Sequence, residues 1–217
     1  MIRVLFICHG NICRSPMAEF IFKDLVRKAG PEGEFEIASA ATSTEEIGND
    51  IYPPARRMLD AHGIPHSRRG ARQITKADYK RYDLLIGMDS ANLRNMRYAF
   101  GGDPLGKIRL MSEFGHFDGE VADPWYTGDF ALTFDQLLDG CRGLLKFARL
   151  LPILQEQIEA PPGLIRPDAS LKDDLSLDSF TIVFLISKVE DVFDTEFSED
   201  EVFYLQTLRD IMDKVQI

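Results

Sequence analysis

A short stretch near the start of the chain brings together residue types that can carry nucleophilic chemistry on an anion. It consists of Cys8, His9, Gly10, Asn11, Ile12, Cys13, Arg14, Ser15 and Pro16. The apolar residues before it predict a buried strand and the periodic residues after it predict a helix, with Ser15 as N-cap and Pro16 as first helical residue. A loop in that place turns successive backbone N–H groups toward one concavity at the positive end of the helix. This arrangement predicts a binding site for a phosphate group.

Two side chains would turn such a site into a reactive centre. The planar guanidinium of Arg14 can bind two phosphate oxygens at once, which a lysine ammonium group cannot do. Cys8 ends the strand beneath the same positive field, which favours its nucleophilic thiolate form. The alternative, a structural cysteine near a surface arginine, leaves the strand, the helix start and the intervening Gly10 and Asn11 unexplained. We therefore expect Cys8 to act as a nucleophile.

The elements that must position this loop predict an α/β domain over residues 1–150. Short apolar runs, expected to be strands, lie at 4–7, 35–38, 82–87 and 107–111, and helical patterns lie at 17–28, 54–62, after Asp89 and at 130–151. This alternation predicts a four-stranded parallel sheet with helices on both faces. Ligands on such sheets bind at the carboxyl ends of the strands, where Cys8 is placed.

The last third of the chain differs in charge and pattern. Residues 151–217 hold 15 acidic and 5 basic side chains and carry the whole net charge of −10. Pro152 predicts a domain joint, because proline can open a helix but disrupts one from inside. A short helix near 152–159, an apolar helix at 180–193, a capping box at Ser198 and Glu201, and a helix opened by Thr207 then predict a small all-α bundle over residues 151–217. The last helix should bury one stripe formed by Leu208, Ile211, Met212 and Val215.

Composition limits the function classes. The chain is 45% apolar and 28% charged, as in ordinary globular proteins, and its longest apolar run of about five residues cannot span a bilayer. No signal-peptide pattern is present, and the three cysteines have no framework spacing, so a reducing cytoplasm is expected. The acidic module should repel nucleic acid and membrane surfaces and attract basic protein partners, unless its charge serves solubility alone.

Residues 1–150 resemble the low-molecular-weight protein tyrosine phosphatases. The Cys-x5-Arg-Ser-Pro pattern lies within residues 4–19, and further similar segments follow in the family's order at 39–43, 71–74, 82–83, 88–93 and 123–126. The resemblance implies the phosphotyrosine phosphatase I-like fold and metal-free, cofactor-free hydrolysis of a phosphotyrosine protein or a small aryl phosphate. Arsenate reduction on the same fold is the competing activity, but it requires resolving cysteines, and none lies between Cys13 and Cys141.

The resemblance also implies a role for individual residues. Cys8 would carry a phosphocysteine intermediate and Asp123 would protonate the leaving phenolate and then deprotonate water. Arg14 and the loop would hold the phosphate oxygens. The phosphate-binding residues of the loop would be His9, Gly10, Asn11, Ile12, Cys13 and Ser15. Asn11, Ser15 and Ser39 match the family's loop-supporting network. The segment 44–49 would line the rim that selects substrates. The rim residues would be Ile47, Asn49, Trp125 and Tyr126, although a buried position is an alternative for Trp125.

Two features of the loop region remain open. The family often has a histidine two residues before segment 71–74, where this chain has Arg69; His66 lies further back and receives no role. Cys13 lies five residues after Cys8, and a reversible disulfide between them that protects the nucleophile is a hypothesis.

The acidic region resembles acyl and peptidyl carrier proteins. The carriers' Asp-Leu-x-Leu-Asp-Ser core is matched at residues 174–179, and the helix that includes residues 188–193 is similar as well. By this resemblance Ser179 would receive 4'-phosphopantetheine from a phosphopantetheinyl transferase, and the acidic helix would bind basic-faced biosynthetic enzymes. A carrier-like fold kept only as an interaction module is the alternative.

Two functions follow for the whole chain. In the first, a cysteine-dependent phosphatase is docked by its tail to a biosynthetic assembly. In the second, a carrier protein of a biosynthetic pathway has a phosphatase half that acts on a phosphorylated substrate tethered to the pantetheine arm or delivered by it.

Overall fold

The first strand places the end of an apolar run at the centre of a parallel sheet. Strand β1 (Ile2–Cys8) lies between β2 (Phe35–Ala41) and β3 (Leu84–Gly87), and β4 (Ile108–Leu110) completes the order β2-β1-β3-β4. All three strand pairings are parallel, with Cys8 beside Ala41 and Ile7 beside Gly87. The carboxyl ends of these strands therefore meet at one edge, as the sequence predicts.

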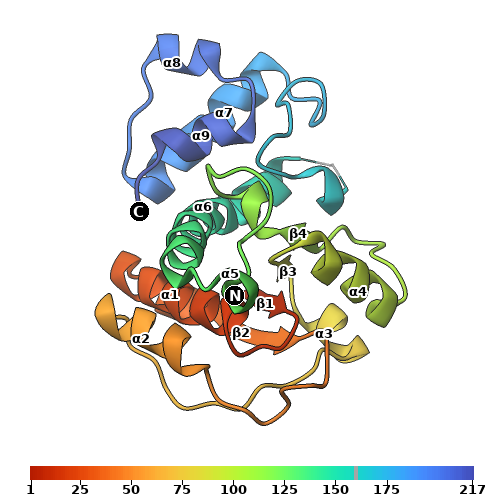
Figure 1. Ribbon diagram of the computed structural model, residues 1–217. Coiled ribbons are helices and arrows are strands. Elements are labelled where there is room, and N and C mark those ends of the chain that lie inside the picture. Colours follow the sequence, from red (N-terminus) through yellow and green to blue (C-terminus); the bar gives the residue numbers. More distant parts are fainter. Residues whose placement is uncertain (159–160) are drawn as a thin grey trace. The chain divides into compact units, whose positions relative to one another are not determined.

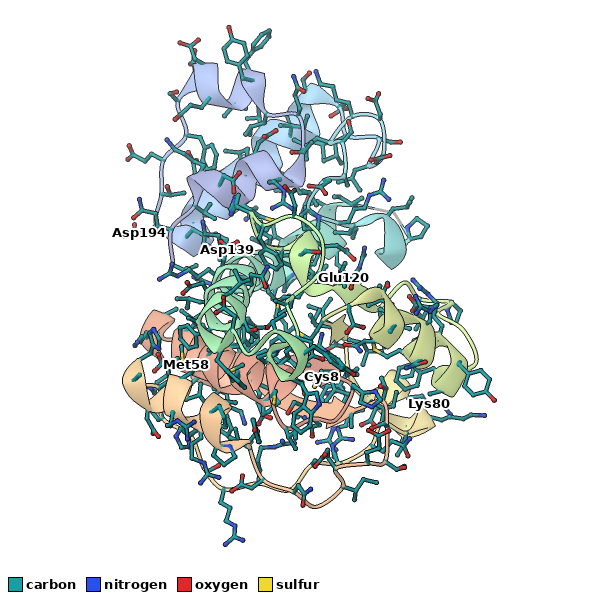
Figure 2. All side chains as sticks on the ribbon, in the orientation of Figure 1. Cys8, Met58, Lys80, Glu120, Asp139 and Asp194 are labelled. Atoms are coloured by element: carbon teal, nitrogen blue, oxygen red, sulfur yellow. The ribbon has the colours of Figure 1, made fainter. Side chains whose placement is uncertain are left out.

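The computed structural model describes residues 1–158 and 161–217 and divides into two units, Met1–Arg142 and Gly143–Ile217 (Figure 1). Within the first unit, alternate residues of β1 face opposite layers, as period-two geometry requires. Leu5 and Ile7 pack in a cluster that includes Met96 of α4 (Ser90–Phe100), whereas Phe6 meets Phe22 of α1 (Arg14–Ala29) edge to face at 5.5 Å. Figure 2 shows Cys8 within this unit and Lys80 at its surface.

Helices cover both faces of the sheet, so the predicted α/β fold class is confirmed. The helices of the first unit are α1 (Arg14–Ala29), α2 (Pro53–Ala61), α3 (Lys76–Arg81), α4 (Ser90–Phe100), α5 (Pro124–Thr127) and the first half of α6 (Phe130–Gln157). Short 3₁₀ turns lie at η1 (Glu32–Glu34) and η2 (Met111–Glu113). The short helices α3 and α5 escaped sequence prediction because each holds fewer than two turns.

The second unit is helical, as predicted. It contains the second half of α6, η3 (Pro162–Leu164), α7 (Ser179–Phe193), α8 (Glu199–Tyr204) and α9 (Leu208–Lys214). The capping boxes at Ser198 and Thr207 are present, and the predicted stripe of Leu208, Ile211, Met212 and Val215 is buried.

Helix α6 differs from the prediction. It continues through Pro152 to Gln157, so the expected helix end before Pro152 and the separate helix after it are wrong; Glu159 and Ala160 lie outside the described residues. The loss of one backbone hydrogen bond is tolerated because Ile153 and Leu154 are buried on the same helix. Across the described residues, no helix combines the length and apolarity that crossing a membrane requires.

Candidate active site

The loop after β1 wraps around the sulfur of Cys8. The backbone N–H of Asn11 donates to Cys8 Sγ over 3.3 Å, and Ser15 Oγ lies 3.1 Å from the same atom. Asn11 has a φ of 58°, a left-handed conformation that asparagine adopts more readily than most residues. This turn aims the Asn11 N–H inward, so the strand-to-helix connection forms the predicted concavity around Cys8.

Helix α1 begins two residues earlier than predicted. Its N-cap is Cys13 and its first residue is Arg14, so Ser15 and Pro16 are the second and third helical residues. Ser15 is not the cap because its hydroxyl instead accepts a hydrogen bond from Asn11 Nδ2 at 2.8 Å and faces Cys8. Pro16 fits the first turn, where its missing N–H costs no helical hydrogen bond.

A buried network holds Asn11. Its Nδ2 donates to Ser15 Oγ and to Ser39 Oγ at 2.8 and 2.9 Å, and Ser39 Oγ donates to Glu19 Oε2 at 2.6 Å. Asn11, Ser15 and Ser39 are each at most 3% exposed. Asn11 therefore links the other two residues, Ser15 and Ser39, that the resemblance places in a loop-supporting network.

Arg69 completes this network, at the position where the resemblance implies a histidine. Its Nη1 donates to the Asn11 carbonyl at 2.9 Å, its Nη2 donates to Asn11 Oδ1, and its Nε lies 3.9 Å from Glu19 Oε2. Burial lowers the pKa of this guanidinium despite the nearby negative charge of Glu19. His66 bonds to Asp60 at 2.9 Å instead, away from the loop.

Arg14 joins two carboxylates over the loop. Its Nη1 donates to Asp89 Oδ2 at 2.7 Å and its Nη2 donates to Asp123 Oδ2 at 2.6 Å. The side chain is 4% exposed; burial alone would lower its pKa, but the charges of Cys8, Asp123 and Asp89 outweigh burial and raise it. Asp123 also accepts from the Trp125 N–H as the N-cap of α5, which fixes the carboxyl beside the guanidinium.

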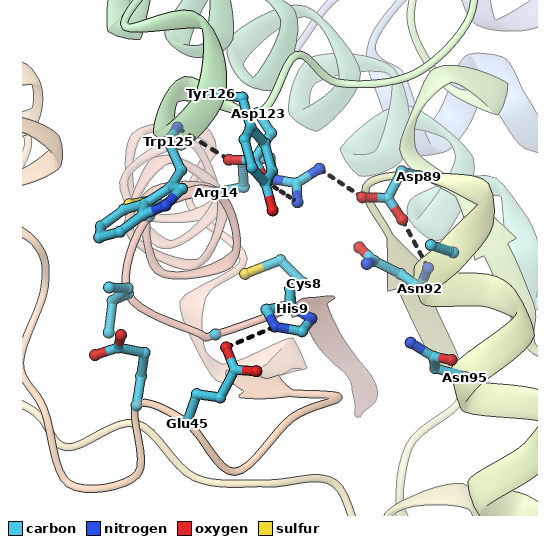
Figure 3. Close-up of a pocket in the computed structure, with 15 residues that line it drawn as sticks. Cys8, His9, Arg14, Glu45, Asp89, Asn92, Asn95, Asp123, Trp125 and Tyr126 are labelled. Carbon is cyan, nitrogen blue, oxygen red and sulfur yellow. Dashed lines mark hydrogen bonds and ion pairs between the residues drawn. The ribbon is translucent and has the colours of Figure 1, made fainter.

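These groups line one cleft with a volume of about 300 Å³ (Figure 3). Of the residues singled out from the sequence, the cleft is lined by Cys8, His9, Gly10, Ile12, Cys13, Arg14, Asp123, Trp125 and Tyr126. Asn11, Ser15, Ile47 and Asn49 do not line the cleft. Trp125 is 57% exposed and contacts the Tyr52 ring at 5.4 Å, so it is a wall residue rather than buried core.

The second cysteine of the loop is held as a thiol. Cys13 packs in a cluster with Ile12 and Ala71. Burial, followed by the negative charges of Cys8 and Asp123, raises its pKa to about 12. Cys13, Cys8 and Cys141 are all free, and Cys13 has little thiolate character at neutral pH.

The sequence assigned no role to Asp89, which follows β3 and caps α4, or to Arg69, which comes from the segment before residues 71–74. Glu45 and Glu46 follow β2 in the segment 44–49, where the resemblance implies a substrate rim, and both line the cleft. Position in the sequence could have marked Asp89, Glu45 and Glu46 as site residues, because polar residues just after parallel strands gather at the edge of the sheet where ligands bind. The described residues contain no group of three side chains of the types that hold a metal ion.

In the second unit, Ser179 is exposed at the first position of α7. Asp178 caps the helix by accepting from the Thr181 N–H at 2.8 Å and its hydroxyl at 2.7 Å, and these hydrogen bonds lower the pKa of Asp178. Leu175 and Leu177 are buried and anchor the segment, and Ser179 is exposed beside them. An exposed serine at a helix N-terminus fits a phosphodiester, whose charge the helix end stabilises.

Comparisons with known proteins agree with both units. Residues 148–215 match the family described as phosphopantetheine attachment site. A Bacillus subtilis relative, low molecular weight protein-tyrosine-phosphatase YfkJ, is 37% identical over 67% of this chain and 94% of its own length. The Schizosaccharomyces pombe low molecular weight phosphotyrosine protein phosphatase is 39% identical over 67% of this chain and 96% of its own.

Solved structures are similar as well. The crystal structure of YfkJ superposes with a TM-score of 0.65 at 36% identity, covering 72% of this chain and 96% of that one. A Streptococcus pyogenes low molecular weight protein tyrosine phosphatase gives 0.60 at 38% identity, covering 67% and 91%. Because residues 3–157 match the family itself, the chain belongs to the low molecular weight phosphotyrosine protein phosphatases, here fused to a phosphopantetheine attachment domain.

Proposed function

We propose that this enzyme hydrolyses phosphotyrosine and other aryl phosphate monoesters with Cys8 as nucleophile, Arg14 as phosphate ligand and Asp123 as proton donor. The observation that carries the proposal is their convergence: Cys8, Arg14 and Asp123 line one cleft (Figure 3), and the Asn11 N–H donates to the Cys8 sulfur. A thiolate, an anion-binding loop and a carboxylic acid are the groups that such hydrolysis requires.

In the first step, the Cys8 thiolate attacks phosphorus and the bond from phosphorus to the phenolic oxygen breaks. The proton of Asp123 passes to the phenolate, which leaves as a neutral phenol. Protonated Asp123 has lost its ion pair with Arg14, so that Nη group is free to bind a phosphate oxygen. The Arg14 Nη2 to Asp123 Oδ2 distance of 2.6 Å places the acid directly beside the phosphate ligand, so this exchange needs no large movement.

In the second step, water attacks the phosphocysteine. Asp123, now a carboxylate, takes a proton from that water, the bond from phosphorus to sulfur breaks, and inorganic phosphate leaves Cys8 as a thiolate. The Asn11 N–H beside Sγ stabilises this negative charge, and Ser15 can donate to it as well.

Two variants test the mechanism. Cys8→Ser should abolish hydrolysis of p-nitrophenyl phosphate, because the hydroxyl is not ionised at neutral pH. Asp123→Asn should slow esters of poor leaving groups by about 10²–10⁴-fold and p-nitrophenyl phosphate much less. Hydrolysis that survives Cys8→Ser would refute the mechanism.

For the second unit we propose that Ser179 receives 4'-phosphopantetheine from a phosphopantetheinyl transferase, and that the acidic unit binds basic-faced biosynthetic enzymes. The match to the attachment-site family and the exposed Ser179 support this proposal. Intact mass after incubation with coenzyme A and a broad-specificity transferase should show the gain of one phosphopantetheine, and Ser179→Ala should remove it. No gain on the folded wild-type protein would favour an acidic docking module.

The presence of a carrier unit favours one second candidate, in which the phosphatase acts on a phosphorylated substrate held by the pantetheine arm. Saturation by a free phosphotyrosine peptide supports the first function, whereas turnover that requires the loaded carrier supports the second.

We also propose a cytoplasmic location, because all three cysteines are free thiols.

A further inference from the structure

The mouth of the cleft carries two carboxylates that the proposed mechanism does not use. Glu45 and Glu46 follow β2 and both line the cleft. Glu46 packs directly on the phosphate loop, since a Cβ added at Gly10 would lie 3.1 Å from its Cγ. In Figure 3 Glu45 lies below His9 and Cys8, and Trp125 lies above it. A phosphotyrosine ring between these walls would place its flanking residues beside the two glutamates.

The charge of these glutamates is not balanced by a permanent cation. The other two carboxylates of the cleft, Asp89 and Asp123, are bonded to Arg14. Glu45 instead contacts His9 Nε2 at 2.9 Å, with 70% of its side chain exposed, and Glu46 accepts from Asn49 Nδ2 at 2.6 Å. Within ranges 1–158 and 161–217, no lysine or arginine forms an ion pair with either glutamate. The mouth is therefore an acidic rim with room for an external cation.

We propose that Glu45 and Glu46 make this phosphatase select phosphotyrosine flanked by lysine or arginine and reject phosphotyrosine flanked by acidic residues. The inference rests on the proposed phosphatase function and adds the charge of the substrate to it. A lysine or arginine beside the phosphotyrosine gains an ion pair at the rim, whereas an acidic residue there is repelled by like charge. Both effects favour the basic substrates over the acidic ones.

The expected size of this selectivity follows from the exposure of the rim to solvent. Ion pairs in water at a protein surface change an equilibrium by a few-fold each. Two glutamates acting on two flanking side chains should therefore give about a tenfold ratio of kcat/KM between basic and acidic substrates. Because the rim is open to solvent, the ratio should shrink as salt concentration rises.

The experiment compares two phosphotyrosine peptides that differ only in having lysine or glutamate on each side of the phosphotyrosine. The readout is the ratio of kcat/KM for the two peptides, since any common loss of catalysis cancels. Wild-type protein, the double variant Glu45→Gln with Glu46→Gln, and the control Glu32→Gln are assayed at one pH and at about 0.05 and 0.5 M salt. Glu32 is an exposed acid before β2, at the opposite edge of the sheet.

We expect the lysine peptide to be preferred about tenfold by wild type and Glu32→Gln, and the ratio to fall toward one in the double variant and at high salt. Equal wild-type rates for the two peptides, or a preference that persists in the double variant, would overturn the inference. If the double variant does not fold, the wild-type ratio and its salt dependence still decide. Failure of the phosphatase proposal looks different, because then p-nitrophenyl phosphate and both peptides remain unhydrolysed.

Discussion

Replacement of Arg69 tests whether the phosphate loop is held from behind. Arg69→Met keeps the length of the side chain and removes its donors. The Asn11 carbonyl accepts no other hydrogen bond from the described residues, and a buried acceptor left without a donor costs about 1–3 kcal/mol. Asn11 Oδ1 retains only the Arg72 N–H at 3.3 Å. We expect the free energy of unfolding to fall by about 3 kcal/mol, since hydrogen bonds to charged groups contribute about 1.5–3 kcal/mol each.

Activity should fall as well, because Asn11 also directs its N–H at Cys8 Sγ. A loop that relaxes from the left-handed conformation at Asn11 loses this donor, and we expect kcat for p-nitrophenyl phosphate to drop about 10- to 100-fold, equivalent to about 1.4–2.7 kcal/mol. The matched control is Arg68→Met, because Arg68 is adjacent in sequence with 94% of its side chain exposed. Arg69→Lys should recover part of kcat by restoring one charged donor.

A pH profile separates positioning from folding. Arginine stays charged across the working range, whereas a histidine at this position changes charge near pH 6.5. The Arg69→His variant should therefore lose activity relative to wild type as pH rises from about 5.5 to 8, because its second donor disappears. If Arg69→Met matches Arg68→Met in kcat, or the Arg69→His ratio is flat with pH, Arg69 does not position the loop.

Three further predictions follow from burial and charge. Native protein treated with iodoacetamide at pH 7–8 should be alkylated at Cys8 and not at Cys13, whose pKa of about 12 keeps it a thiol; peptide mass mapping that finds Cys13 modified first would contradict this. Asp24 is buried; burial opposes its ionisation, but hydrogen bonds from Lys28 and Arg27 outweigh it and lower the pKa. Ionised Asp24 should thus stabilise the fold above the pKa that it has in the unfolded chain, and this contribution should disappear as pH falls through its lower pKa in the folded protein. In urea titrations Asp24→Asn should therefore lower the free energy of unfolding at pH 7 and change it little at pH 2. Gly87→Ala should lower the free energy of unfolding by about 1–3 kcal/mol, because its Cβ would lie 2.5 Å from Leu93 Cδ1; unchanged stability would show that this contact relaxes freely.

The fold was largely predictable because its signals are local. The apolar run before Cys8 and the periodic helix after it fix the central strand, the loop and α1 within 29 residues. Pro152 shows where local rules fail. A proline disfavours a helix interior by about 3 kcal/mol, yet burial of the adjacent Ile153 and Leu154 keeps α6 continuous. Tertiary burial of this kind has no signature in the proline itself.

The residues of the site likewise fall into two groups, those that a local sequence pattern predicts and those that only the fold brings together. Cys8 and Arg14 share one loop, so their spacing alone predicts their meeting. Asp89 and Glu45 come from other parts of the chain and arrive only because β2 and β3 lie on either side of β1 in the sheet. The replacement of the family's frequent histidine by Arg69 was visible in the sequence. Its contact with both oxygens of Asn11 was not, because that contact depends on how the segment before Ala71 folds back.

The charges of the cleft explain why the loop must be held so firmly. Its described lining contains four carboxylates and one guanidinium, so net charge does not attract a phosphate dianion. Binding must then come from short-range donors: the loop N–H groups, the start of α1 and Arg14. Such donors act only in the right geometry, which Asn11 and Arg69 supply from behind the loop. A positive side chain beside the phosphotyrosine relieves the same repulsion from the substrate side, so positioning by Arg69 and selection by Glu45 and Glu46 address one electrostatic problem.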